Sequence, residues 1–147
     1  MKLPVNPEFL NLDLELESSR SLAALSVFFA KSSEVLFNDR VGRSHRLTVE
    51  PLIRGKLNGH IGQCTNHFLK VLAELPPQLI PVWKGCKRRV LDYGFDGGLE
   101  TAPLVVSLTN RQLSGIAELG LSITVTIYSF RENEPEPSAL IEPSVEQ

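Results

Sequence analysis

The sequence has few of the residues that would assign it to a specialised class. Its 147 residues include only two cysteines, Cys64 and Cys86, which are too few for a disulfide framework. In a reducing compartment both are expected to be thiols. No apolar run approaches the roughly 20 residues of a membrane-spanning helix, and residues 1–10 lack the basic-then-apolar pattern of a signal peptide. We therefore expect a cytoplasmic protein with no membrane association.

Strong charge is also missing from most of the chain. The formal net charge is −2, with 42% hydrophobic and 22% charged residues, which is typical of an ordinary globular domain. Residues 131–147 differ, because they hold five acidic side chains, one basic side chain and three prolines. We expect a single α+β domain over residues 1–130, followed by a flexible, acidic, proline-containing tail over residues 131–147.

The clearest local pattern is a strand, a capped helix, a glycine stop and a second strand. Alternating apolar residues predict a strand over 104–108. Thr109 and Gln112 form the S/T-x-x-E/Q capping box that begins a helix, and Gly120 can end that helix in the left-handed conformation. Renewed alternation over 121–128 predicts a strand with one polar or partner-facing side.

Similar patterns run through the rest of the chain. Leucine alternates with acidic residues over 12–17, and a hairpin is expected within 35–49. The longest amphipathic helix is expected over 61–75, before two prolines, and a further strand over 89–95. The resulting order predicts an α+β fold, a two-layer sandwich with a mainly antiparallel sheet and helices on one face.

The opening and closing units resemble each other weakly, which raises the hypothesis of an internal β-α-β duplication. At a constant offset, Ser18, Arg20, Leu22, Leu25 and Phe28 match Thr109, Arg111, Leu113, Ile116 and Leu119. Neighbouring strand phases slip by one residue between the two units. Duplication and chance similarity therefore both stay open.

The closing unit also resembles a known family, on the motif S/T-x-x-x-L-x-x-I/L-A-x-L-G followed by a strand that ends in I-Y. The matching residues are Thr109, Leu113, Ile116, Ala117, Leu119, Gly120, Ile127 and Tyr128. This pattern is similar to the C-terminal part of the bacterial domain of unknown function 4279 family. The acidic first strand and the V-L-D-Y-G segment add support. The resemblance implies a small bacterial cytosolic α+β protein and supplies no activity or catalytic residue.

The best metal candidate is the spacing His60-x-x-x-Cys64-x-x-His67 on the predicted long helix. The two histidines would lie about 10 Å apart along the axis, whereas Zn–N bonds are about 2 Å, so one ion cannot easily bind both. A catalytic site with Cys64 as the nucleophile, supported by His67 and Asp92, is disfavoured because a reactive thiol needs exposure. We expect no catalytic residue, no metal and no cofactor. A metal-dependent enzyme using His60 and Cys64 is the second alternative.

Two surfaces could bind a macromolecule. The polar faces of the first and last strands are candidates for a protein partner: Asp13, Glu15, Glu17, Thr124, Thr126 and Tyr128. Two basic groups are candidates for a nucleic acid: Arg40, Arg43 and Arg46 with His45, and Lys84, Lys87, Arg88 and Arg89. Nucleic-acid binding is the less favoured hypothesis. Trp83 and Tyr93 do not alternate with the basic residues in the pattern typical of proteins that bind single strands.

The sequence as a whole thus favours a non-enzymatic bacterial protein-interaction domain. An inhibitor or immunity protein is one form that this role could take, and a homodimer is another. A nucleic-acid-binding accessory protein is the first alternative. The identity of any partner does not follow from the sequence.

Overall fold

The computed structural model describes residues 6–53, 56–57, 60–99 and 102–129. The predicted tail lies outside these described residues. The elements, in chain order, are β1 (Glu8–Ser18), α1 (Ala23–Phe29), β2 (Ser33–Val41), β3 (Ser44–Ile53), β4 (Lys56–Leu57), α2 (Ile61–Ala73), the 3₁₀ turn η1 (Pro77–Leu79), α3 (Ile80–Lys84), β5 (Arg88–Asp96), α4 (Asn110–Glu118) and β6 (Ser122–Tyr128).

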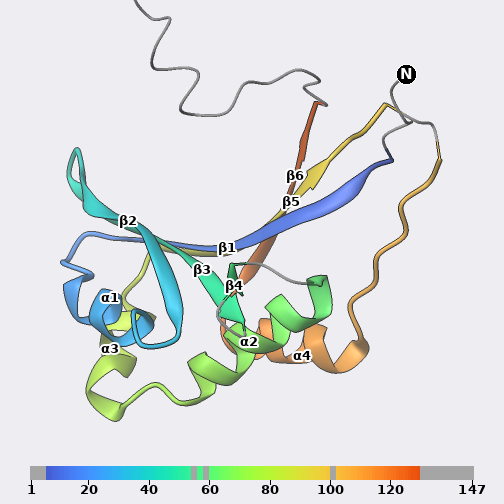
Figure 1. Cartoon of the computed structure of the whole chain (residues 1–147). Helices are drawn as coiled ribbons and strands as arrows, with labels where there is room; N and C mark the ends of the chain where they lie inside the picture. The colour runs from blue at the N-terminus through green and yellow to red at the C-terminus, as the bar shows by residue number, and fades with distance from the viewer. Residues whose placement is uncertain (1–5, 54–55, 58–59, 100–101, 130–147) are drawn as a thin grey trace, which may run out of the picture.

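The strands form one mixed sheet with the order β2-β3-β1-β5-β6, and β4 extends it beside β3. All neighbouring pairs are antiparallel except β5 and β6, which are parallel. The helices pack on one face of this sheet (Figure 1). The predicted α+β sandwich, with a mainly antiparallel sheet and helices on one face, is confirmed.

Three β-α-β crossovers build this arrangement, and the middle one runs through α2 from β3 to β5, which are parallel with β1 between them. Because β3 is antiparallel to both β1 and β2, the strands that α1 connects are parallel, with β3 between them. The strands that α4 connects are parallel and adjacent. Up to β5, the order β-α-β-β-α-β is that of a split β-α-β domain. The two units therefore differ in sheet placement, and their common origin stays a hypothesis.

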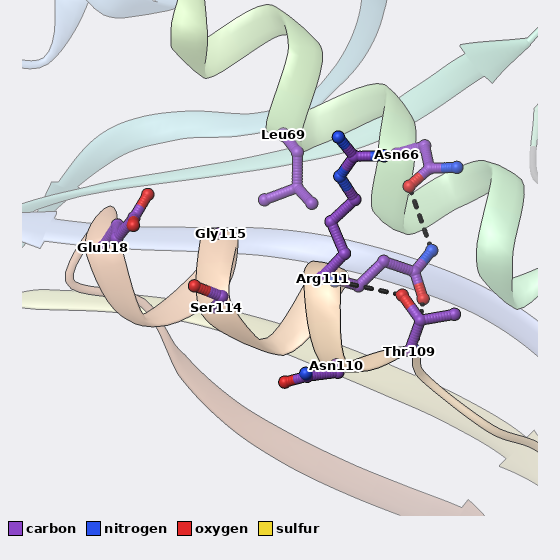
Figure 2. A pocket seen from close by; sticks show the side chains of 9 residues that line it. Asn66, Leu69, Thr109, Asn110, Arg111, Ser114, Gly115 and Glu118 are labelled. Carbon is purple, nitrogen blue, oxygen red and sulfur yellow. Dashed lines mark hydrogen bonds between the residues drawn. The ribbon is translucent and has the colours of Figure 1, made fainter.

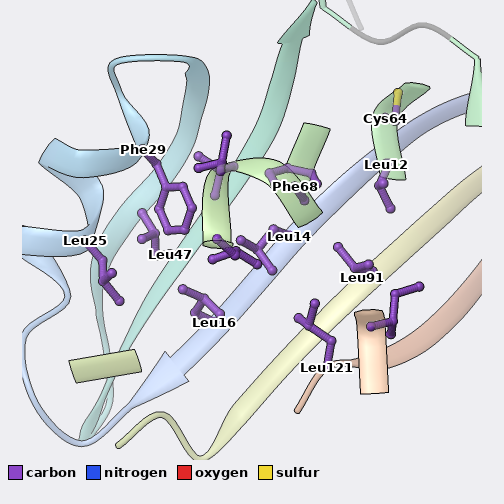
Figure 3. Packing of buried hydrophobic residues seen from close by; sticks show 14 of the residues in the cluster. Leu12, Leu14, Leu16, Leu25, Phe29, Leu47, Cys64, Phe68, Leu91 and Leu121 are labelled. Carbon is purple, nitrogen blue, oxygen red and sulfur yellow. The ribbon is translucent and has the colours of Figure 1, made fainter. Parts of the chain in front are cut away.

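The core lies between the sheet and the helices (Figure 3). Alternation along β1 turns Leu12, Leu14 and Leu16 toward the helices, where each is at most 2% exposed. Phe68 of α2 and Phe29 of α1 pack against this leucine row and are fully buried. Within the part of the chain that the structure describes, no helix is both long and apolar enough to cross a membrane.

The closing unit follows its local signals. The Thr109 hydroxyl accepts a hydrogen bond from the backbone N–H of Gln112 at 3.1 Å, and the Gln112 side chain accepts one from the N–H of Thr109 at 2.9 Å. Gly120 ends the helix with a φ of +71°, in the left-handed region that favours glycine. The predicted capping box, glycine stop and last strand are confirmed.

The predicted strand over residues 104–108 is wrong, because this segment pairs with no strand of the described chain. Val105 is 82% exposed, and Leu104 and Val106 are exposed as well. The place beside β5 is taken by β6. Alternation specifies a segment with two different faces, but a strand also needs a free neighbouring edge with which to pair.

Candidate functional site: the open face of the sheet

The face of the sheet that the helices leave open carries a concentration of acidic side chains. Along β1, Asp13, Glu15 and Glu17 alternate with the buried leucines and therefore lie on this open face. Along β6, Ser122, Thr124, Thr126 and Tyr128 lie on the same face. Their register partners include Asp92, which in turn lies opposite Asp13. The structure thus places both predicted partner-binding sets on one surface.

Strand pairing assembles four carboxylates into a line across this face. Glu34 of β2 lies opposite Glu50 of β3, and Asp13 of β1 lies opposite Asp92 of β5. Glu50 completes the line, because the pairing of Leu14 with Val49 places it beside Asp13, whose pKa its charge raises. We call Glu34, Glu50, Asp13 and Asp92 the carboxylate row.

Asp13 is the centre of the carboxylate row. Burial is the largest cause that raises the pKa of Asp13, and the charge of Glu50, a hydrogen bond to it, and the charges of Glu15 and Asp92 add to the effect. Together they bring this pKa from 3.8 to about 7. Asp13 Oδ1 is buried and has no hydrogen-bond partner among the described residues. The ionised form of Asp13 is therefore disfavoured by its burial and by the acidic residues around it.

Polar neighbours hold the two carboxylates on either side of Asp13. Glu50 is only 6% exposed, and the side-chain amide of Asn11 donates a hydrogen bond to its Oε2 at 3.3 Å. On the other side, the Thr126 hydroxyl donates to Oδ1 of Asp92 at 2.8 Å. Gly94 lies between these two groups, and a Cβ at this position would overlap the side-chain oxygen of Asn11. These contacts therefore hold Glu50 and Asp92 in place beside Asp13.

The basic residues on this face pair with the end of β1, beside the row. Arg88 Nη1 lies 3.1 Å from Glu15 Oε1, and Lys87 Nζ lies 3.9 Å from Glu17 Oε2. Arg46 lies opposite Glu17 in the register of β1 and β3. Glu15, Glu17, Arg46 and Arg88, with Thr48, surround a hollow of about 340 Å³. Residues from the two rival surfaces of the sequence analysis thus meet here, and their charges partly cancel.

Of the predicted nucleic-acid residues, Arg46 and Arg88 meet at this hollow, and others lie on separate elements. Arg40 and Arg43 lie at the β2–β3 hairpin, whereas Lys84 ends α3. Arg89 serves the fold, because its guanidinium donates hydrogen bonds to the backbone oxygens of Trp83, Cys86 and Gly120 at 3.0 to 3.2 Å. It also lies over the indole ring of Trp83, 5.6 Å from the ring centroid.

The metal candidates on α2 are separated by their environments. His60 is exposed at the start of the helix, whereas Cys64 is fully buried in the core. His67 Nε2 lies 2.9 Å from the Ser33 hydroxyl, and burial, with a smaller contribution from Lys70, lowers the pKa of His67. Among the residues that can be described, no group of three or more potential ligands is placed to hold a metal ion.

A second hollow, of about 930 Å³, lies between α2 and α4 (Figure 2). The Gln112 amide reaches across it and donates to Asn66 Oδ1 at 2.9 Å. Gly115 lets the helices approach closely, since a Cβ there would lie 3.3 Å from the methyl groups of Leu69. Thr109, Gln112 and Asn66 are linked by hydrogen bonds, and together with the close approach at Gly115 they form a helix-helix contact.

Sequence reasoning missed three members of the carboxylate row, namely Glu34, Glu50 and Asp92. Alternation places Thr48 and Glu50 opposite the buried Leu47 and Val49, so the face of Glu50 was open to inference. The closeness of Glu50 to Asp13 could not be inferred from the sequence, because the pairing of β1 with β3 joins segments that are far apart in the chain.

Comparisons of the chain with known protein families, with curated proteins and with solved structures find no match. What can be said of its role therefore rests on its own residues.

Proposed function

We propose that the protein is a non-enzymatic protein-interaction domain whose open sheet face binds a basic segment of a partner protein in the bacterial cytoplasm. The observation that carries this proposal is the group of Asp13, Glu50 and Asp92, which holds charges that repel one another. The ion pairs described on this face go to Glu15 and Glu17 instead. The two buried thiols, Cys64 and Cys86, suit a reducing compartment.

A lysine or arginine side chain is the group that this surface suits best. A cation between Asp13 and Asp92 would offset their mutual repulsion and favour the ionised form of Asp13. Charge-assisted hydrogen bonds to carboxylates are about twice as strong as neutral ones. Because Asp13 and Glu50 are largely shielded from water, the attraction would be screened by salt less than on a fully exposed surface.

The basic residues beside one end of β1 give the surface a preferred direction. Arg88 and Lys87 lie at one end of β1, whereas Asp13 lies near its middle. A basic segment would therefore be repelled at the Arg88 end and attracted over the row. This difference favours one orientation of the partner, which is how charge patterns contribute to specificity.

The experiment is a titration of the whole protein with an amidated octalysine peptide, followed by calorimetry. The test variant is Asp13→Asn with Asp92→Asn, which removes two charges from the row and keeps an oxygen that can accept from Thr126. The control is Glu74→Gln with Glu118→Gln, which removes two exposed charges from α2 and α4. The titration is run at pH 8, where Asp13 is largely ionised, so that both variants have about the same net charge.

We expect the row variant to lose about tenfold or more in affinity, which corresponds to about 1.4 kcal/mol. The control should stay within about twofold of the wild type. Equal losses in both variants would show that only net charge matters, and unchanged affinity in the row variant would remove the row as the binding surface.

A further inference from the structure

β6 is an edge strand without the features that usually protect an edge. Its sequence, S-I-T-V-T-I-Y, contains no charged residue and no proline. The opposite edge, β2, carries Glu34, Asp39 and Arg40, and its pairing with β3 is interrupted by a bulge between Val35 and Phe37. Charges and bulges of this kind prevent a strand from pairing with another chain. In the part of the chain that the structure describes, one edge of the sheet is thus protected, and the other is open.

The open edge presents backbone groups that can form hydrogen bonds. The carbonyl oxygen of Tyr128 accepts from the N–H of Gly97 at 2.8 Å, so the backbone groups of Tyr128 face β5. Because the direction alternates along a strand, those of Ile123, Val125 and Ile127 face away from β5. Within the described chain no strand lies on that side.

The same three residues also present apolar side chains. Ile123, Val125 and Ile127 lie opposite Leu91, Tyr93 and Phe95 in register, on the face that the helices cover. Yet they are 41%, 58% and 69% exposed, so the cover becomes less complete along β6. A neighbouring strand would remove part of this surface from water.

The sequence of β6 points to the neighbour. Residues 123–127 read I-T-V-T-I, which is the same in both directions. We propose that β6 pairs antiparallel with β6 of a second copy, across a two-fold axis at Val125. Val125 then lies opposite Val125 of the second copy, Ile123 opposite Ile127, and Thr124 opposite Thr126. The contact is isologous, as in most soluble dimers.

Pairing of β6 with itself is favourable for three reasons: its backbone hydrogen bonds, its side-chain contacts and its lack of charge. The three outward-facing residues of each copy form hydrogen-bonded pairs, with about six N–H···O bonds in total. β-Branched side chains then face each other across the strands, which is a favourable combination in antiparallel sheets. Since β6 is uncharged, two copies bring no like charges together at the strands. This inference does not depend on the basic partner proposed above.

Cysteine cross-linking tests the pairing and its register. Val125→Cys places two thiols in one cross-strand pair, with Cα atoms about 5.5 Å apart, within the range of a disulfide. Ile123→Cys alone places its thiols in different pairs. We expect mild oxidation to link Val125→Cys with itself and Ile123→Cys with Ile127→Cys, but not Ile123→Cys with itself. The native cysteines are buried and serve as the background.

Failure of Val125→Cys to cross-link would overturn the proposal. Equal cross-linking by Ile123→Cys alone would overturn this register. Sedimentation of the wild type at increasing concentration gives an independent measurement. We expect a dimer that Val125→Lys dissociates and that Val105→Lys, at an exposed position outside β6, leaves intact. A monomer throughout, or a dimer that only Val105→Lys disrupts, would show that β6 does not pair with itself.

Discussion

Asp13 lies where burial and neighbouring acids raise its pKa from 3.8 to about 7. In the unfolded chain the same carboxyl should titrate near its ordinary value. Between these two values the folded state binds more protons than the unfolded state. The contribution of Asp13 to stability is therefore present at low pH and is lost as the pH rises from about 4 to about 7.

Asp13→Asn should remove this dependence, because the amide is neutral at every pH and can still donate to Glu50. Between about pH 4 and about pH 8, the free energy of unfolding of the wild type should fall by about 1–2 kcal/mol more than that of the variant, after allowance for solvent screening. Urea unfolding across this range measures the difference. Parallel pH profiles for the two proteins would contradict the environment described for Asp13.

At the scale of elements, Arg89 connects three parts of the fold. It lies near the start of β5, and its guanidinium binds backbone oxygens at the end of α3 and at Gly120, just after α4. The indole N–H of Trp83 donates to the backbone oxygen of Leu119 at 3.2 Å and strengthens the same junction. These contacts need the planar fork of an arginine.

Arg89→Lys should therefore lower the free energy of unfolding by about 1–3 kcal/mol, although the charge is kept. Its neighbour Arg88 offers a matched control, because it forms an exposed ion pair with Glu15. Arg88→Lys should change stability by less than about 0.5 kcal/mol. Denaturant unfolding compares the two variants. Equal effects would show that the Arg89 contacts do not stabilise this junction.

The elements that could be predicted from the sequence are those with local causes. The Thr109 capping box and the Gly120 stop act within a few residues, so their pattern was sufficient to predict α4. Residues 104–108 were predicted wrongly from their local pattern, because a strand also requires a free edge elsewhere in the molecule. The hairpin was predicted, but β2 continues to Val41 and turns at Gly42, whose φ is +65°.

At the scale of the whole molecule, the candidate site forms because the strands of the sheet are paired in one particular register. The acidic face of β1 was visible as alternation, and its members were named from the sequence. The carboxylate row could not be predicted, because it forms only when β1 lies between β3 and β5 in one particular strand register. The same register places Arg88 opposite Glu17, from where its side chain forms an ion pair with Glu15. The ion-paired end of the face is thereby separated from the carboxylate row.

A two-fold dimer through β6 would extend this surface. Since Thr124 and Thr126 lie on the open face, the sheets of two copies would join with their carboxylate rows on the same side of one continuous sheet. A partner with two basic segments could then bind both rows at once, which raises avidity without any new contact.

The most direct test of the proposed function is the number of protons released when octalysine binds. At pH 7 the Asp13 carboxyl is about half protonated, because its pKa is about 7. A cation on the carboxylate row lowers that pKa, so calorimetry in buffers of different ionisation enthalpy should show release of up to about half a proton per complex. Asp13→Asn should show none. Binding without proton release in the wild type, or equal release in both proteins, would contradict the proposal that Asp13 lies at the centre of the binding surface.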